Sequence, residues 1–310
     1  MASIAYVTDK NMIEFHRLNG NHTINFWKPS NSKKMSSFNT GDLLFFLAKG
    51  TEKGIGKEKG VIGYGKFTKN YILTFPQMWA KYKTLNGYPS KQALGEAIIK
   101  ITKNHQLPEC LNCLLLDNVV FFQCPIYMSE IGVDISNKIE SYIYIDKDDM
   151  MNTSKILEVA NNVGLDMWSS MYHDEDEAIF LEDALIQTVY NIYEKINHTY
   201  YSNYDENRIY KYIQTNEQAQ ALTNSKTEYF IKQENKIVVC LPCMVNTNDF
   251  MKKFQYVIGH YFLYKGFIAK SEYFNEILVQ IEFDQIISEE LKAVLEIQNI
   301  KYKERLVEID

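Results

Sequence analysis

Between residues 24 and 87, short apolar runs alternate with loops rich in glycine, serine, lysine and asparagine. The runs Ile24–Trp27, Leu43–Leu47 and Val61–Phe67 are four to seven residues long and rich in aromatic and branched side chains. Runs of this kind, bounded by turn-forming residues, are typical of short strands in a compact sheet or barrel. Two glycines inside the third run indicate a sharp bend of the sheet or a close approach to its backbone.

The rest of the chain completes an α+β pattern. Apolar spacing predicts helices over residues 75–84, 90–103, 180–196, 249–264 and 289–297, and strands over 4–7, 111–127, 141–145, 229–231, 237–241 and 277–283. No repeat or long Gly/Ser linker separates the halves. We expect a first domain of residues 1–148 and a second of 149–310, with the boundary between about residues 148 and 176.

Charge is distributed unevenly along the chain. Residues 1–107 carry 16 lysine and arginine residues against 6 aspartate and glutamate residues, a net charge of +10. Residues 151–310 carry 15 against 25, a net charge of −10. The asymmetry predicts a first half that faces a polyanion and a second half that recruits a partner or keeps the chain soluble. Chance clustering of surface lysines is the alternative.

The cellular compartment is indicated by what the sequence lacks. Residues 1–7 contain no basic stretch followed by a long apolar segment. No apolar run reaches the roughly 18 residues that would predict a membrane-spanning helix. We therefore expect a cytoplasmic protein without a membrane partner.

Two Cys-x-x-Cys pairs, Cys110/Cys113 and Cys240/Cys243, formally supply the four ligands of a zinc site, and Cys124 is a fifth cysteine. The pairs lie about 130 residues apart in different predicted domains, and both adjoin apolar runs. These surroundings favour free thiols in a reducing compartment, so we expect no structural metal.

The segment Lys49–Gly60 has four glycines and four lysines. Glycine lets backbone amides approach an anion, and lysine adds point charge, so such a loop is suited to tracking phosphates. It lacks the P-loop spacing. A solvated hairpin tip is the equally weighted alternative.

Five sequence landmarks follow one another in the first 147 residues. They are Asn25-Phe26-Trp27-Lys28-Pro29-Ser30, Phe38 with Gly41-Asp42, Val61-Ile62-Gly63-Tyr64-Gly65-Lys66-Phe67, Trp79-Ala80-Lys81-Tyr82 with Asn86-Gly87, and Val119-Val120-Phe121-Phe122. In this order they resemble the N-terminal PUA-like, EVE/ASCH-related domain of bacterial HNH-type, modification-dependent restriction endonucleases. The resemblance implies a PUA-like β-barrel with flanking helices, followed here by a mixed α/β domain.

What this resemblance implies is recognition of DNA, often of a modified base that is flipped out of the helix and held between aromatic faces. A flipped base needs aromatic faces, polar groups for its edge and cations for the flanking phosphates. Candidate nucleic-acid-binding residues are Trp27, Tyr64 and Trp79 for the faces, Asn25, Ser30 and Asp42 for the edge, and Lys28, Lys33, Lys34, Lys57, Lys59 and Lys66 for the phosphates. Core packing is the competing role for Trp27 and especially for Trp79.

The second half lacks the nuclease part of that family. We find neither a His-Asn-His pattern nor a carboxylate–lysine set that would hold Mg²⁺, and Glu282 and Asp284 have no lysine at the required spacing. The acidic residues of 174–177 and 182–183 adjoin a predicted helix start, where carboxylates are favoured without a metal. We therefore expect no catalytic residues and no cofactor.

Residues 249–283 also resemble a degenerate zinc metallopeptidase of the ImmA/IrrE type. The helix of that family carries His-Glu-x-x-His, which provides two metal ligands and a base. Here Tyr256 and Val257 occupy the first two positions and only His260 remains, while Glu272 and Glu276 lie where the third ligand is expected. An amphipathic helix with a single histidine is the preferred interpretation.

Taken together, the sequence predicts a DNA-binding protein that senses a modified or flipped base within a bacterial restriction or phage-defence system. Its acidic half is expected to bind a protein partner or to mediate self-association. Two alternatives stay open: a modification-dependent endonuclease that uses Mg²⁺ at an unrecognised site, and an RNA-binding PUA-like protein.

Overall fold

The computed structural model describes residues 3–29, 35, 37–54, 57–102, 104–133, 135–136, 138–196, 200–222 and 225–307. The chain divides into two compact units, Met1–Phe180 and Leu181–Asp310. The expected domain boundary at residue 148 therefore lies inside the first unit. Both units mix helices and strands, so the α+β class is confirmed.

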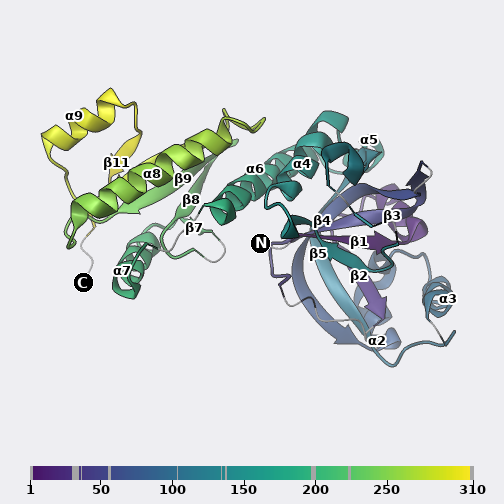
Figure 1. Cartoon of the computed structure of the whole chain (residues 1–310). Helices are drawn as coiled ribbons and strands as arrows, with labels where there is room; N and C mark the ends of the chain where they lie inside the picture. Colours follow the sequence, from purple (N-terminus) through teal and green to yellow (C-terminus); the bar gives the residue numbers. More distant parts are fainter. Residues whose placement is uncertain are drawn as a thin grey trace. The chain divides into compact units, whose positions relative to one another are not determined.

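A six-stranded sheet forms the centre of the first unit, in the order β2-β5-β4-β3-β1-β6. The strands are β1 (Ile4–Thr8), β2 (Ile24–Pro29), β3 (Leu43–Lys53), β4 (Glu58–Leu73), β5 (Leu111–Ile126) and β6 (Tyr142–Tyr144). Strands β1 and β3 are parallel, and the other neighbours are antiparallel. Figure 1 shows β4 and β5 as the long, strongly curved arrows of this sheet.

The curvature has a local cause in the glycine-containing run of β4. The register with β5 shifts on both sides of Gly63 and Tyr64. Gly63 has a φ of +154°, and a Cβ there would lie 2.3 Å from the carbonyl oxygen of Val120. Such bulges bend a strand and increase its twist, which explains the curl.

The result is an open half-barrel, whereas the sequence led us to expect a barrel. Within the described residues, the two edge strands β2 and β6 are not paired with each other. Side chains from both sides of this opening, on β1 and β2, line a cleft. The opening matters for function because it leaves these inward-facing side chains accessible to a ligand.

Several helices of the first unit begin at a residue whose side chain caps them. The helices of this unit are α1 (Lys10–Leu18), α2 (Phe75–Tyr82), α3 (Lys91–Ile101), α4 (Asn152–Val163) and α5 (Met167–Ser170), with α6 (Asp176–Lys195) beginning in it. Asp9 caps α1, Thr74 forms a capping box with Gln77 at α2, and Ser90 caps α3. Sequence analysis anticipated α2 and α3 but not α1.

The segment after residue 148 belongs to the first unit because it is fastened to the end of α1 and to the loop that follows it. Arg17 pairs with Asp166 at 2.9 Å, and the Trp168 indole donates to the carbonyl oxygen of Leu18 at 3.2 Å. His22 Nε2 lies 2.7 Å from Asp176 Oδ1, and the His22 ring centroid is 3.5 Å from that of His173. Helix α4 contacts β5.

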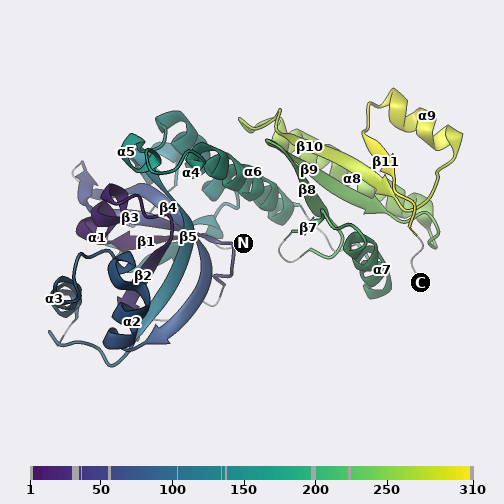
Figure 2. The ribbon, with the colours of Figure 1, turned by 180° about the vertical axis from the view of Figure 1, so that it is seen from behind.

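The second unit has a five-stranded sheet, in the order β11-β10-β9-β8-β7. Its elements are α7 (Asn203–Gln214), β7 (Gln220–Ala221), β8 (Tyr229–Gln233), β9 (Lys236–Cys243), α8 (Phe250–Ile268), β10 (Ile277–Phe283), α9 (Glu289–Ile297) and β11 (Tyr302–Glu304). Strands β9, β10 and β11 are parallel, and β7 and β8 are antiparallel to their neighbours. Figure 2 shows the long helix α8 running along this sheet.

The buried run of β9 follows from helices on opposite faces of this sheet. Tyr212 and Ile213 of α7 pack with Val238 and Cys240 of β9 in one apolar cluster. Helix α8 contacts β9 and β10, with Phe254 6.1 Å from Phe283 between ring centroids. A strand that is covered on both faces has a continuous run of apolar residues. This explains why apolar and polar residues do not alternate along β9.

Candidate functional site

The first unit contains a cleft of about 460 Å³ at the open side of its sheet. Its walls come from β1, the start of α1, β2, the loop residue Tyr88 and helix α3, and Lys49 and Glu140 also contribute. A volume of this size lies within the range of small-molecule sites and exceeds the needs of one nucleobase. The cleft is therefore the site from which we build.

Aromatic rings line the cleft from opposite strands. Phe26 on β2 makes an edge contact with Tyr6 on β1, at 5.0 Å between centroids and 72° between planes. Trp27 and Tyr88 lie 6.4 Å apart with planes inclined by 47°. These rings offer the flat apolar surfaces that a planar heterocycle needs.

A buried amide network holds Trp27 in place. The indole Nε1 donates to the backbone carbonyl of Asn86 at 3.0 Å, and Asn25 Nδ2 donates to Asn86 Oδ1 at 2.7 Å. Asn86 Nδ2 in turn donates to the carbonyl of Lys83 at 2.7 Å. Trp27 is only 7% exposed, but it still lines the cleft. Its orientation is thus set before any ligand arrives.

Gly87 lets the turn after Asn86 pack against α1. Its φ is +83°, and a Cβ would lie 2.5 Å from Met12 Cγ and 2.9 Å from His16 Nε2. Burial lowers the pKa of His16 to about 3, so the imidazole is neutral here at ordinary pH. The Asn-Gly pair therefore fixes the position of Tyr88, which follows it, relative to Met12 on the opposite wall.

Lys28 is the charged group inside the cleft. It is 5% exposed, and its Nζ lies 6.0 Å from the ring centroid of Tyr6 and 5.8 Å from that of Tyr142. Among the described residues it has no hydrogen-bond or ion-pair partner, so the aromatic faces are its stabilising neighbours. Burial lowers the pKa of Lys28. We expected Lys28 to hold a phosphate at the surface, but the structure places it inside the cleft.

The other titratable groups of the cleft divide into an exposed set and a buried set. Asp9, Lys49 and Glu140 are exposed and of mixed sign. Burial raises the pKa of Tyr6 to about 12, with a smaller contribution from Tyr142. Burial and the neighbouring Asp9 raise the pKa of Tyr88 to about 12. Both hydroxyls therefore stay protonated at neutral pH and can donate hydrogen bonds.

Three further predicted site residues lie away from the cleft. Asp42 is completely buried and accepts a 2.7 Å hydrogen bond from the backbone amide of Asn39 in the turn before β3. Tyr64 is completely buried, 5.7 Å from Phe45 between ring centroids. Trp79 is half-buried and packs against the hydrophobic core. None of the three lines the cleft, so the structure does not bring them together with Trp27 and Lys28.

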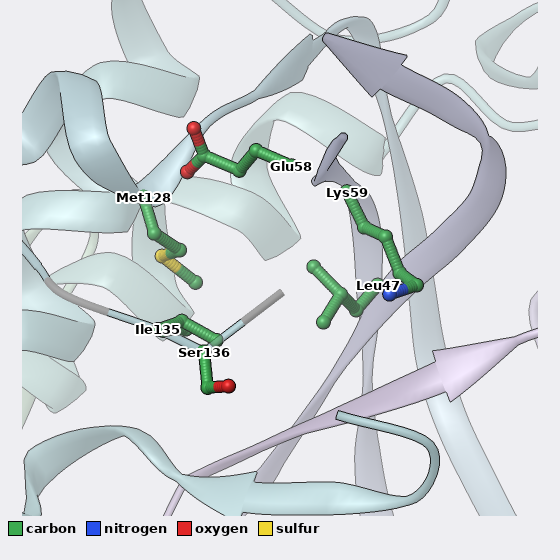
Figure 3. A pocket seen from close by; sticks show the side chains of 6 residues that line it. All are labelled: Leu47, Glu58, Lys59, Met128, Ile135 and Ser136. Carbon is green, nitrogen blue, oxygen red and sulfur yellow. The ribbon is translucent and has the colours of Figure 1, made fainter. Parts of the chain in front are cut away.

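Of the other predicted phosphate ligands, the three that the structure describes do not line the cleft. Lys57 is exposed in the turn before β4, and Lys66 is half-buried on β4. Lys59 borders a separate cavity of about 10 Å³, which Figure 3 shows with Glu58 and Met128 among its walls. That volume is about enough for one water molecule. Ser30, Lys33 and Lys34 lie outside the described residues.

Three of the candidate residues weighed in the second unit have polar partners within that unit. His260 is buried, and its Nδ1 lies 2.7 Å from Glu228 Oε1, a partner that sequence analysis did not identify. Glu182 forms an ion pair with Lys232. Asp284 accepts a 2.7 Å hydrogen bond from the backbone amide of Val245.

No described part of the chain contains three His, Cys, Asp or Glu side chains arranged to hold a metal ion. The cysteines are free thiols; Cys113, Cys240 and Cys243 are buried, Cys110 is half-buried and Cys124 is exposed. The two Cys-x-x-Cys pairs lie in different compact units. Helices long and apolar enough to cross a membrane are likewise absent from the described residues.

Comparison with known proteins gives fold-level similarity at most. No protein-family model matches the chain, and no curated protein matches it. Among solved structures, it is similar to the ASCH protein from Zymomonas mobilis, with 14% identity over 50% of this chain and 94% of that one and a TM-score of 0.34. A tyrosine-to-phenylalanine variant of that protein gives 13% identity, 51% and 99% coverage and a TM-score of 0.36. A serine-to-alanine variant has 10% identity over 51% of this chain and 96% of that one, with a TM-score of 0.36.

Proposed function

We propose that the first unit binds nucleic acid and takes one unstacked base into the cleft beside Trp27. The observation that carries this proposal is the aromatic cleft itself, in which Trp27 is pre-oriented by Asn86. A base removed from its stack loses the contacts of its neighbours, and aromatic faces replace them. Because the amide network fixes the indole in advance, little ordering is needed on binding.

The charge that favours a polyanionic ligand lies in residues 1–107, which have a net charge of +10. The first unit as a whole, residues 1–180, carries 19 lysine and arginine residues against 20 aspartate and glutamate residues, so its positive charge is local. Lysines that neutralise phosphates release counterions, so binding weakens steeply as salt increases. We therefore expect affinity for single-stranded DNA to fall by at least tenfold between 50 and 200 mM salt, an order-of-magnitude figure for several phosphate contacts.

The finer assignment to DNA, and to a modified base within a restriction or phage-defence system, rests on the five sequence landmarks and is part of the same proposal. The acidic second half, with a net charge of −10 over residues 151–310, would then bind a protein partner or another copy of the chain. RNA is the alternative ligand, because an aromatic cleft accepts the bases of both nucleic acids.

The test is replacement of Trp27 by alanine in the full chain. Stacking on an aromatic side chain contributes about 1–3 kcal/mol per base, so affinity for a single-stranded oligonucleotide should fall by roughly 5- to 150-fold. Electrophoretic mobility shifts at fixed salt measure this change. Preference for a duplex that contains a modified base should be lost, while affinity for an unmodified duplex is mostly retained.

The matched control is replacement of Trp168, a half-exposed tryptophan on α5 that does not line the cleft. Trp168→Ala should bind like the unaltered protein. If Trp27→Ala folds and binds equally well, no base enters the cleft. The same binding measurements on oligonucleotides with ribose in place of deoxyribose compare RNA with DNA directly.

A further inference from the structure

We propose that Lys28 makes the cleft selective for a base whose inward edge presents an exocyclic oxygen, in preference to one that presents an exocyclic amino group. The inference rests on the proposed function, since it specifies which bases the same cleft accepts. It assigns Lys28 to the base edge and no longer to the phosphates.

The position of Lys28 separates it from the phosphate backbone. Its side chain is almost fully buried and lies against Tyr6 and Tyr142, which are register partners on β1 and β6. A base that enters a pocket keeps its sugar and phosphates toward the mouth, and its far edge meets the interior. Lys28 is largely buried and lines the cleft, so it would meet this edge of the base.

Sequence alternation explains why a lysine lies there. Successive side chains of a strand point to opposite faces, so Lys28 lies on the same face of β2 as Phe26 and Trp27 lies on the other. Strand β2 is at the edge of the sheet, and all three side chains line the cleft. Phe26 packs on Tyr6, and the Lys28 ammonium lies near the same ring. Lys28 is thus held at the aromatic wall by the strand that also supplies Trp27.

The chemistry of an ammonium group sets the preference. It has three donors and no acceptor, and Lys28 has no carboxylate partner among the described residues. Asp9 and Glu140 also line the cleft but are exposed, and neither forms a salt bridge with Lys28. A carbonyl oxygen would accept a charge-assisted hydrogen bond in this desolvated setting. An amino group would place donor against donor.

The experiment uses two matched pairs of bases in one single-stranded oligonucleotide context. Hypoxanthine and adenine differ in carrying an oxo or an amino group at the same ring position, with the accompanying ring proton, and so do uracil and cytosine. The unaltered full chain should bind the oxo member of each pair on the order of tenfold more tightly, the range expected for one hydrogen bond to a charged group. Competition binding at fixed salt measures the ratio.

The decisive variant is Lys28→Met, which keeps the length of the side chain and removes its charge and donors. The oxo-to-amino ratio should fall to about one, while the affinity for amino bases changes little. Lys28→Arg retains the charge and should retain a preference for oxo bases. Thermal unfolding followed by circular dichroism shows whether each variant is folded. If Lys28→Met destabilises the chain, Lys28→Arg can still be compared with the unaltered protein.

Two outcomes would overturn the inference. Equal affinity of the unaltered protein for oxo and amino bases, with binding that still depends on Trp27, would refute the role of Lys28 and leave the proposed function standing. Competition by ribose 5-phosphate that disappears in Lys28→Met would show that Lys28 binds a phosphate. Loss of dependence on Trp27 would refute the proposed function itself.

Discussion

The two units each bury a charged side chain at their sheet, and they treat it in opposite ways. Glu282 on β10 is completely buried and accepts hydrogen bonds from Tyr229, from Tyr212 at 3.3 Å and from Gln280 at 3.1 Å. Arg305 Nε lies 3.4 Å from the same carboxylate. Lys28 in the first unit is 5% exposed, and among the described residues it has the rings of Tyr6 and Tyr142 beside it and no hydrogen-bond acceptor.

This difference separates structure from function. A buried charge whose hydrogen bonds are complete contributes to packing and leaves nothing for a ligand to satisfy. A buried charge without acceptors costs free energy in the empty protein, and a suitable ligand recovers part of that cost. Glu282 belongs to the first kind and Lys28 to the second, which is why we place the binding site in the first unit.

The largest expected effect comes from breaking the Glu282 network. Glu282→Ala leaves Arg305 and two tyrosine hydroxyls without their acceptor, so the free energy of unfolding should fall by about 3–5 kcal/mol. Urea unfolding of the full chain measures the loss. In Lys28→Met, by contrast, stability should be unchanged or higher by on the order of 1 kcal/mol.

The buried Lys28 should also make the stability of the protein depend on pH. Because burial lowers the pKa of Lys28, the unfolded chain binds more protons than the folded chain as pH approaches the usual lysine value of 10.5. The stability of the unaltered protein should therefore rise relative to Lys28→Met as pH increases through that window. A loss of several kcal/mol in Lys28→Met at neutral pH would remove the distinction between the two buried charges.

An intermediate effect is expected at Asn86, which supports the cleft without lining it. Asn86→Ala keeps the backbone carbonyl that Trp27 uses, but it removes the side-chain partner of Asn25. The unpaired buried amide should cost about 1–3 kcal/mol of stability. Base affinity should fall together with stability, because the orientation of Trp27 depends on this turn. Urea unfolding and mobility shifts on the same preparation measure both, and full affinity in a destabilised variant would contradict the positioning role.

The smallest effect is a pH dependence at the contact between His22 and Asp176. Burial and the neighbouring His173 lower the pKa of His22, against the opposing influence of Asp176. The unfolded chain therefore binds the proton more readily, and this contribution to stability is present above about pH 6.5 and lost as pH falls below it. Thermal unfolding should show a lower stability at pH 5 than at pH 7. His22→Gln should reduce that loss, and an identical pH profile in the variant would exclude this contact as its source.

Sequence reasoning located most helices and strands because their apolar periodicity is strong. Helix α1 was not predicted, because its buried face includes His16, a polar residue that interrupts the apolar pattern. The compact units divide after Phe180. The contacts of Arg17, Leu18 and His22 that join residues 164–176 to the first unit are long-range contacts, which no local pattern reveals.

The sequence predicted only some of the residues that line the cleft. Trp27 and Lys28 were identified from one motif, but Tyr6 and Tyr88 join them through the parallel pairing of β1 with β3 and through the turn at Gly87. Strand order is a long-range property that single-sequence patterns do not encode. One signal was available: Asn86-Gly87 directly precedes an aromatic residue.

The three tryptophans occupy three different environments, and this has a practical optical consequence. Trp27 is 7% exposed and hydrogen-bonded in the cleft, Trp79 is half-buried on α2, and Trp168 is 51% exposed on α5. A chain with phenylalanine at positions 79 and 168 would emit from the cleft indole alone. Its blue-shifted fluorescence, and the quenching of that emission by a stacked heterocycle, would then make the protein its own reporter of occupancy.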